Sequence, residues 1–240
     1  MDTWASELFH FLPLCCGGEV CFNPFDSNFI LGETQNGGLA RTIDGGTNWL
    51  DGTNGISESE SVAWVAPIIA HPTTSGTFYV ARQKVYRSID NGANWTAISA
   101  NVNGTSPVRE MAISKSNPSI MFATSSSLVF KSTDAGLTWT NVTSGLPSKT
   151  ITSVSVYPTD ANLVFLTFSG FGTNKVYKST NGGTTWISIH GNLPDSPVND
   201  LFVYTGNLGF PNTFFVATLL FEKYPALSPI KMLFARASPV

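Results

Sequence analysis

The sequence predicts an all-β fold, a β-propeller of four-stranded antiparallel blades. Its main support is a nine-residue phrase that occurs four times, at residues 41–49, 87–95, 131–139 and 178–186, and reads RTIDGGTNW, RSIDNGANW, KSTDAGLTW and KSTNGGTTW. The fourth positions of successive copies are 46, 44 and 47 residues apart, and a period of this size indicates a tandem array of one structural unit. Short apolar runs between Gly, Pro, Asn and Asp residues surround each copy, and helical periodicity is absent.

The second unit shows the complete pattern of strands. Its apolar runs lie at residues 62–70 and 77–81, a third run at 84–88 leads into the phrase, and a fourth follows at 96–99. Four short strands repeating every 44 to 47 residues are typical of a propeller, in which each blade covers the apolar face of the next. The other units predict strands at 20–22, 29–32 and 38–42, at 110–114, 120–124 and 128–132, at 151–157, 163–168 and 175–179, and at 198–204 and 213–218.

The fifth unit departs from the pattern after its second strand. Residues 222–240 contain three prolines and no phrase, so we expect a propeller over residues 1–221 followed by a divergent or truncated segment over 222–240. Five units are visible, which fits either a five-bladed ring or part of a larger propeller.

Composition and charge exclude several classes of partner. Only 12% of the residues are charged, against roughly 25% in an average soluble domain. The net charge of -3 provides no basic surface for nucleic acid or acidic lipid, so neither is an expected partner. The apolar stretch at residues 8–16 is too short to span a bilayer and lacks a basic leader region, so we predict neither membrane insertion nor a signal peptide within the chain.

The three cysteines, Cys15, Cys16 and Cys21, do not form a disulfide framework because an odd number cannot pair fully within one chain. Buried free thiols and a bridge from Cys15 or Cys16 to Cys21 both stay open. No further Cys or well-placed His lies near them, so we predict no zinc site. The sequence likewise predicts no cofactor.

The residues of the phrase suit a tight turn between two strands. A carboxylate or amide at its fourth position can accept hydrogen bonds from the turn backbone, and the glycine two residues later supplies a positive φ without steric cost. The tryptophan at the ninth position then anchors the returning strand. The fourth and ninth positions are Asp44 and Trp49, Asp90 and Trp95, Asp134 and Trp139, and Asn181 and Trp186.

The phrase resembles the Asp-box, or BNR repeat, written S/T-x-D-x-G-x-T-W, and the resemblance covers four blades. It implies that each phrase forms the hairpin between the third and fourth strands of a blade, with a structural role. One carboxylate per turn is too few ligands for calcium, and Asn181 lacks even that carboxylate, so we predict no metal there.

The candidate functional surface therefore lies at the other end of the strands, where the loops at residues 50–61, 97–108, 142–149 and 188–199 emerge. Trp64 stands outside any phrase and could stack on a sugar, although core packing would also explain it. Alignment of the first strands places three carboxylates at equivalent positions, with Arg109 beside one of them: Glu19, Glu110 and Asp200. Two such groups could act as a pair in glycoside hydrolysis or attract a cation; capping loop backbone is the alternative.

Asp-box propellers include sialidases, xyloglucan-active hydrolases, sortilin-type receptors, photosystem II assembly factors and exported bacterial proteins, so the fold does not choose a function. The resemblance is strongest to the exported bacterial BNR-repeat proteins. A sialidase would need an arginine triad, and two of the five arginines, Arg41 and Arg87, open phrases. We expect a non-catalytic propeller, secreted or at the cell surface, that binds a protein or a carbohydrate. A glycoside hydrolase using Glu19, Glu110 or Asp200 is the alternative, and the oligomeric state stays open.

Overall fold

A computed structural model of the chain describes residues 17–191, 193–204 and 213–218. These residues form strands β1 to β18 and one short 3-10 turn, η1 (Gln35–Gly37), without any α-helix in the described ranges. They divide into two compact units: the described residues of Met1–Ile113 with Pro118–Met121 and Ser132–Trp139, and those of Ser114–Asn117, Phe122–Lys131 and Thr140–Val240. We call them unit 1 and unit 2. Cys15, Cys16 and residues 222–240, for which the sequence made predictions, lie outside the described residues.

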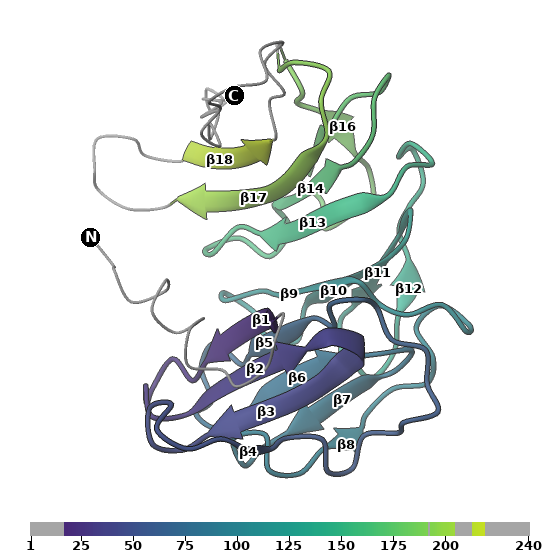
Figure 1. The fold of residues 1–240 in the computed structure, drawn as a ribbon. Helices are drawn as coiled ribbons and strands as arrows, with labels where there is room; N and C mark the ends of the chain where they lie inside the picture. Colours follow the sequence, from purple (N-terminus) through teal and green to yellow (C-terminus); the bar gives the residue numbers. More distant parts are fainter. Residues whose placement is uncertain (1–16, 192, 205–212, 219–240) are drawn as a thin grey trace, which may run out of the picture. The chain divides into compact units, whose positions relative to one another are not determined.

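The strands form four-stranded sheets in which sequence neighbours lie side by side, and we call each sheet a blade (Figure 1). Blade 1 contains β1 (Gly17–Phe22), β2 (Ile30–Thr34), β3 (Gly38–Thr42) and β4 (Leu50–Asp51). Blade 2 contains β5 (Ile68–Ala70), β6 (Phe78–Ala81), β7 (Val85–Ser88) and β8 (Thr96–Ala97). Blade 3 contains β9 (Glu110–Ile113), β10 (Met121–Ser125), β11 (Leu128–Ser132) and β12 (Thr140–Asn141). Blade 4 contains β13 (Ile151–Val156), β14 (Val164–Phe168), β15 (Val176–Ser179) and β16 (Ile187–Ser188).

The fifth sheet within the described residues is a hairpin of two strands, β17 (Val198–Tyr204) and β18 (Thr213–Thr218). The prediction of repeated four-stranded antiparallel units is therefore confirmed for four blades. One predicted strand is shorter than its apolar run, because only Ile68–Ala70 of residues 62–70 pairs with β6. Pro67 has no N–H for a sheet ladder, and the N–H of Ala66 binds the side chain of Glu33 instead.

Each phrase forms the turn between the third and fourth strands of its blade, and the side chain at its second position organises that turn. In blade 1 the hydroxyl of Thr42 accepts hydrogen bonds from the N–H groups of Asp44, at 3.3 Å, and Gly46, at 2.9 Å, and donates one to the Asp44 carboxylate at 2.8 Å. The same carboxylate accepts from the backbone and the side chain of Asn48, at 2.9 and 2.7 Å. The corresponding hydroxyls in the other blades are Ser88, Ser132 and Ser179.

Asn181 preserves this geometry, but donor and acceptor are exchanged in its hydrogen bond to the side chain at the eighth position. Its amide oxygen accepts from Ser179 and from the N–H of Thr185, both at 2.9 Å, as an aspartate oxygen does in the other turns. Its amide nitrogen donates to the Thr185 hydroxyl at 2.8 Å, whereas in blade 3 the Thr138 hydroxyl donates to Asp134 at 2.6 Å. Threonine can donate in one turn and accept in the other because a hydroxyl is both a donor and an acceptor.

Two of the four phrase tryptophans connect neighbouring blades. The indole N–H of Trp95 donates to the carbonyl of Gly52 in blade 1 at 2.8 Å, and that of Trp186 donates to Val142 at 2.9 Å. In each case the carbonyl belongs to the residue that follows the fourth strand of the preceding blade. Trp139 instead donates to Gly136 in its own turn, at 3.1 Å, and the buried Nε1 of Trp49 has no partner in the described part of the chain.

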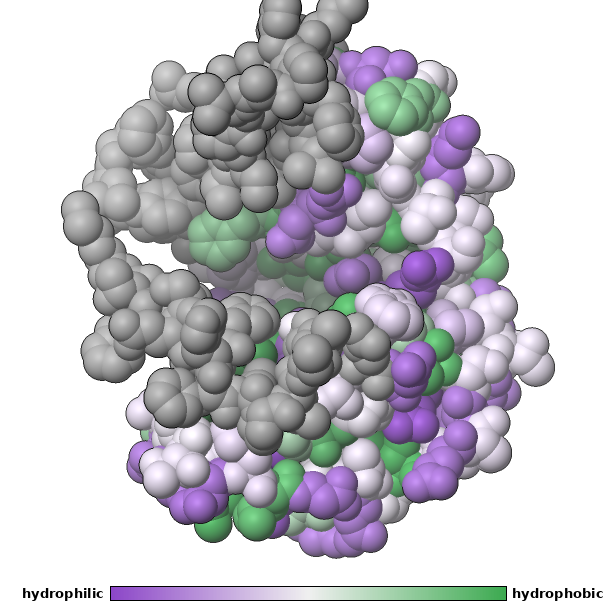
Figure 2. All heavy atoms as spheres, in the orientation of Figure 1, coloured by the Kyte–Doolittle hydropathy of each residue, from purple (hydrophilic) through white to green (hydrophobic). Residues whose placement is uncertain are grey.

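The core of unit 1 lies between blades 1 and 2, where Leu31, Ile68, Phe78, Tyr86 and Trp95 pack together. Unit 2 has a corresponding cluster of Phe165, Val176, Val198 and Leu201 between blade 4 and the β17–β18 hairpin. On the face drawn in Figure 2, hydrophobic side chains occur in small groups among hydrophilic ones. Surface apolar residues scattered in this way need no partner to explain them.

Candidate functional site

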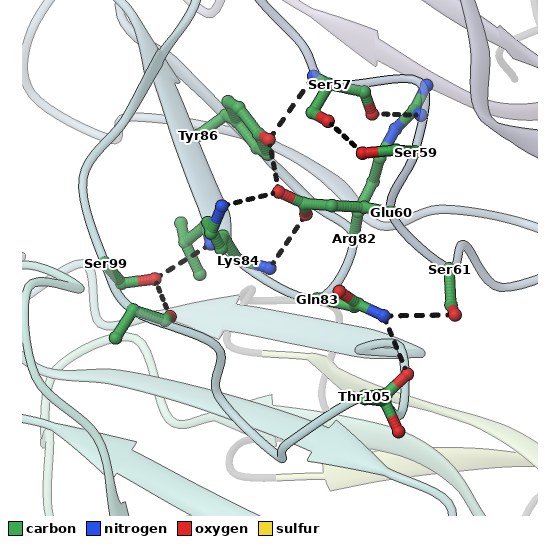
Figure 3. Close-up of polar contacts among 12 residues, drawn as sticks. Ser57, Ser59, Glu60, Ser61, Arg82, Gln83, Lys84, Tyr86, Ser99 and Thr105 are labelled. Carbon is green, nitrogen blue, oxygen red and sulfur yellow. Dashed lines mark hydrogen bonds and ion pairs between the residues drawn. The ribbon is translucent and has the colours of Figure 1, made fainter.

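The end of blade 2 opposite its phrase turn carries a network of polar contacts (Figure 3). Three segments meet there, residues 57–61, 82–84 and 99–105, and we call them the loop end of blade 2. Arg82 is buried and reaches back toward blade 1. Its guanidinium donates to the carbonyl of Ser57 at 2.9 Å and to that of Gly37 at 2.7 Å. One side chain thus fixes the β2–β3 turn of blade 1 and the connection between the blades.

Glu60 is the acidic member of the same network and is 9% exposed. It accepts a hydrogen bond from the Tyr86 hydroxyl at 2.6 Å and forms an ion pair with Lys84 at 3.0 Å. Burial alone would raise the pKa of Glu60, but the hydrogen bonds from Tyr86 and Lys84 outweigh it and hold the pKa below its ordinary value. Burial, together with the bond to Glu60, raises the pKa of Tyr86. At neutral pH the site therefore contains a carboxylate, an ammonium and a neutral phenol.

Trp64 lies on the connection that this network holds in place. Trp64 is 62% exposed and Val65 is 38% exposed, whereas Ala63 and Ala66 are buried. Gln83 stabilises the loop end by donating to Ser61 at 3.1 Å and to the carbonyl of Thr105 at 2.9 Å. The sequence left core packing of Trp64 as an alternative, and the structure places the ring at the surface.

Glu19 and Glu33 of blade 1 accept hydrogen bonds from backbone N–H groups at and just before β5. The Ile68 N–H donates to Glu19 Oε2 at 3.0 Å and the Ala66 N–H donates to Glu33 Oε1 at 2.8 Å. Burial raises the pKa of the Cys21 thiol to about 12 and outweighs a hydrogen bond from the Ala70 N–H, so the thiol is protonated at neutral pH. Alternate N–H groups of a strand point to the same edge, and blade 1 thus supplies a side-chain partner for three in succession.

Glu33 is the most deeply buried of these groups. It is 0% exposed, and its Oε2 has no hydrogen-bond partner in the described residues. Burial raises the pKa of Glu33 more than the nearby backbone N–H groups of Ala66, Glu19 and Gly37 and the charge of Arg82 lower it. A Cβ on Gly18 would lie 1.8 Å from that oxygen, so a larger residue there would force the Glu33 carboxyl to move. Because no ligand can reach it, Glu33 is a structural acid and not a catalytic one.

The other two carboxylates found by alignment stand at the starts of first strands. Glu110 begins β9 in unit 1, and Asp200 lies in β17 in unit 2, where its Oδ1 accepts from the N–H of Leu201 at 2.7 Å. Glu19 and Asp200 each adjoin an irregularity in strand register, as their alignment suggests. Such bulges often lie beside binding sites. Arg109, just before β9, is exposed.

In unit 2 a buried lysine connects the β14–β15 loop with the β16–β17 loop. Lys175 is 0% exposed in its side chain, and its ammonium donates to the Thr173 carbonyl at 2.5 Å and to Asp195 at 2.8 Å. Its backbone N–H donates to Nδ1 of His190 at 3.2 Å. Asp195 also accepts from the N–H of Gly172, with 2.9 Å to each carboxylate oxygen.

No group of three or more His, Cys, Asp or Glu residues within the described ranges could hold a metal ion. Those ranges also contain no helix with the length and hydropathy that a bilayer crossing requires.

Sequence reasoning did not single out Glu33, Glu60, Arg82 or the Lys175–Asp195 pair. A signal existed for the lysines, because Lys84 and Lys175 open the matching runs KVYRS and KVYKS. A carboxylate inside the apolar strand ILGET was a second signal. Neither reveals its partner, which in each case comes from a loop without a repeated sequence.

Comparison with known proteins finds no matching family model and no matching curated protein. Solved structures do match. A GH74 enzyme from Niastella koreensis superposes with a TM-score of 0.65 at 20% identity, over 86% of this chain and 34% of that one. YCF48 bound to D1 peptide gives 0.59 at 13% identity, over 86% and 63%. The extracellular domain of BT4673 from B. thetaiotaomicron gives 0.59 at 12% identity, over 83% and 26%.

At these identities the likeness shows the fold, and the predicted β-propeller architecture is confirmed. The chain spans 30% to 34% of the length of three GH74 enzymes that it matches. The likeness to GH74 enzymes therefore shows the fold of this chain and not their activity.

Proposed function

We propose that this chain is a non-catalytic propeller of the Asp-box class, exported from the cell, that binds a carbohydrate through the loop end of blade 2. A protein ligand is the other form of this proposal. The propeller domain in this proposal covers residues 1–221, and residues 222–240 form a separate segment. The observation that carries the proposal is a 62% exposed Trp64 on a connection whose backbone is held at several points.

Those points of attachment lie on both sides of the ring. Before Trp64, the N–H of Trp95 binds the carbonyl of Asn54 at 2.9 Å, and Arg82 and Tyr86 bind the two backbone groups of Ser57. After it, the N–H of Ala66 binds Glu33. A surface that is ordered before the ligand arrives avoids the entropy cost of ordering on binding.

The chemistry around Trp64 suits a sugar. An indole face offers a flat apolar surface for the C–H face of a pyranose ring, and nearby amides and hydroxyls can bind sugar hydroxyls. The exposed polar side chains of the connecting loops include Glu58, Ser59, Ser61, Asn101, Thr105 and Arg109. Two kinds of ligand occur among the similar structures, because one is a xyloglucanase and one is bound to a peptide.

The phrase turns have no part in binding in this proposal. Their carboxylates at Asp44, Asp90 and Asp134 are already occupied by hydrogen bonds within the turn, and Asn181 performs the same task without a charge. We assign them the structural role of Asp-boxes.

Glycoside hydrolysis is the second candidate function, because the similar structures include GH74 enzymes. Glu19, Glu110 and Asp200 are its candidate acids. Glu19 already binds the Ile68 N–H, which suits a structural carboxylate at least as well as a catalytic one.

The test is a glycan array followed by affinity measurement on the oligosaccharide retained best. Trp64→Ala should reduce affinity at least roughly tenfold, a typical loss for a stacking aromatic in a binding site. Ile89→Ala is the matched control, because that side chain is 73% exposed on the phrase turn of the same blade. Equal affinity of the two variants would remove Trp64 from the site, and retention of peptides in place of glycans would select the protein ligand.

A reducing-sugar assay on polysaccharides distinguishes binding from turnover. The binding module predicts retention without product. Product formation that is lost in Glu19→Gln or Asp200→Asn would overturn the non-catalytic assignment.

A further inference from the structure

The loops at the non-phrase end of blade 4 are joined by a cluster whose bonds require one particular protonation state. We call this cluster the latch; it consists of Gly172, Lys175, His190 and Asp195. Asp195 accepts from the Gly172 N–H and the Lys175 ammonium, and His190 accepts from the Lys175 N–H. His190 and Asp195 come from the β16–β17 loop, whereas Gly172, Lys175 and the Thr173 carbonyl that also accepts from the Lys175 ammonium belong to the β14–β15 loop.

The bond to His190 exists only while its imidazole is neutral. An imidazole nitrogen accepts a hydrogen bond through its lone pair, and a protonated imidazole has donors at both nitrogens. Protonation at Nδ1 would place a hydrogen atom against the Lys175 N–H and a positive charge beside the Lys175 ammonium. The backbone of Lys175 would then have to move away or lose its partner.

The charged groups that act on His190 are Lys175 and Asp195. Burial first, and then the charge of Lys175, lower the pKa of His190, whereas the charge of Asp195 and a hydrogen bond to the backbone of Leu193 oppose them. On the other side of the loop, Lys149 Cδ would lie 3.9 Å from a Cβ on Gly170. Tyr157 packs against the same buried cluster as Ile189 and Leu193, which lie on either side of His190 in the sequence.

We propose that neutral His190 holds the β14–β15 loop closed, and that protonation of His190 opens the latch and releases residues 169–174. This loop carries Phe171, which is 64% exposed. Acidification would therefore change how unit 2 presents an aromatic side chain at its loop end. The inference needs no ligand and stands apart from the proposed function of Trp64.

The pH range follows from the direction of the shift. An unfolded or released histidine titrates near its ordinary value of 6.5, and in the closed latch His190 titrates lower. The latch is therefore at full strength above about pH 6.5 and loses strength as the pH falls through the lowered pKa. Asp195 does not contribute in this range, because its bonds to Lys175 and Gly172 hold its pKa below 3.8.

Hydrogen exchange measured by mass spectrometry at pH 7.5 and pH 5.5 tests the proposal, after correction for the intrinsic exchange rate. We expect the amides of Gly172 and Lys175 to lose protection roughly tenfold or more at the lower pH. Protection around Thr152, in β13 of the same unit, should not change. Equal protection of the loop at both pH values would overturn the proposal.

His190→Asn is the matched variant, because an asparagine Oδ1 can take the place of Nδ1 as acceptor and does not titrate in this range. Its loop should stay protected at both pH values, and the same pH-dependent loss as in the unchanged protein would overturn the proposal. Lys175→Met should remove protection at both. If His190→Asn does not fold, an NMR titration of the unchanged protein decides: the Gly172 and Lys175 amide signals must follow the titration of His190 with one midpoint below pH 6.5.

Discussion

The two ends of the blades differ in how far they repeat. At the phrase end, four turns use the same hydroxyl at the second position, the same oxygen acceptor at the fourth and the same donor at the eighth. At the other end, each blade has its own contacts. Repeated sequence therefore produces repeated structure where bonds are local, and the ends that do not repeat are free to carry function.

Lys84 and Lys175 show the difference within one position of the repeat. Both precede the third strand of a blade, yet Lys84 pairs with Glu60 from the loop before its blade and Lys175 with Asp195 from the loop after it. Lys84 is 37% exposed beside a buried acid, whereas Lys175 is fully buried beside an acid that is 57% exposed. The same residue thus organises different loops, according to which loop supplies the carboxylate.

The largest effect should come from breaking a phrase turn. Ser88→Ala removes one hydroxyl that accepts from the N–H groups of Asp90 and Gly92 and donates to Asp90. The Gly92 N–H is then buried without a partner, and we expect a loss of roughly 2–3 kcal/mol in the free energy of unfolding. Urea denaturation measures it, with the exposed Ser59→Ala at the loop end of the same blade as control. A loss no larger than that of the control would contradict the assigned role.

The second prediction separates the two lysines. Lys84→Met leaves the carboxylate of Glu60 buried without its ammonium, whereas Lys175→Met leaves Asp195 in contact with water. Breaking a pair costs most when the remaining charge is buried. We expect Lys84→Met to lower the urea midpoint roughly twice as much as Lys175→Met. The reverse order would show that the exposure of the remaining acid does not decide the cost.

The third prediction concerns the edge of β5. Glu33 has a raised pKa in the folded protein, so its contribution to stability is greatest below the ordinary value of 4.5 and is lost as the pH rises through the raised pKa. Glu33→Gln keeps an acceptor for Ala66 and cannot ionise. It should stabilise the protein by about 1 kcal/mol at pH 8 and by less at pH 4.5. Thermal melts at both pH values measure this, and a stabilisation that does not depend on pH would show that Glu33 is not the responsible group.

The smallest effect should be that of Asn181→Asp. The new carboxylate can accept from the Thr185 hydroxyl, as Asp134 does from Thr138, so the melting temperature at pH 7 should rise slightly. Hydrogen bonds from Thr138, first from its side chain and then from its backbone, lower the pKa of Asp134 to about 2. The same arrangement in blade 4 should add stability that is present above pH 3.8 and is lost as the pH falls toward 2. If the melting temperature of the variant depended on pH below 3.8 in the same way as that of the unchanged protein, the two turns would not be equivalent.

The position of the site could be predicted from the sequence only in outline. Trp64 was identified because it lies outside every phrase, and its exposure agrees with a surface role. The partners that hold its loop, Arg82, Glu60 and Glu33, could not be identified because each contacts a residue more than 20 positions away that belongs to no repeated pattern.

The sequence by itself determined the repeating four-stranded unit, because its apolar runs recur with the phrase. It also determined the turn at each phrase, because the bonds of that turn join residues two to four positions apart. Only the tertiary structure decided which carboxylates are buried, which strand edge they satisfy and which lysine holds which loop. These choices depend on side chains brought together by the contact of one blade with the next. A buried carboxylate or a lysine–carboxylate pair of this kind leaves no local pattern in the sequence. Its effect on stability depends on how far the folded protein excludes water from it.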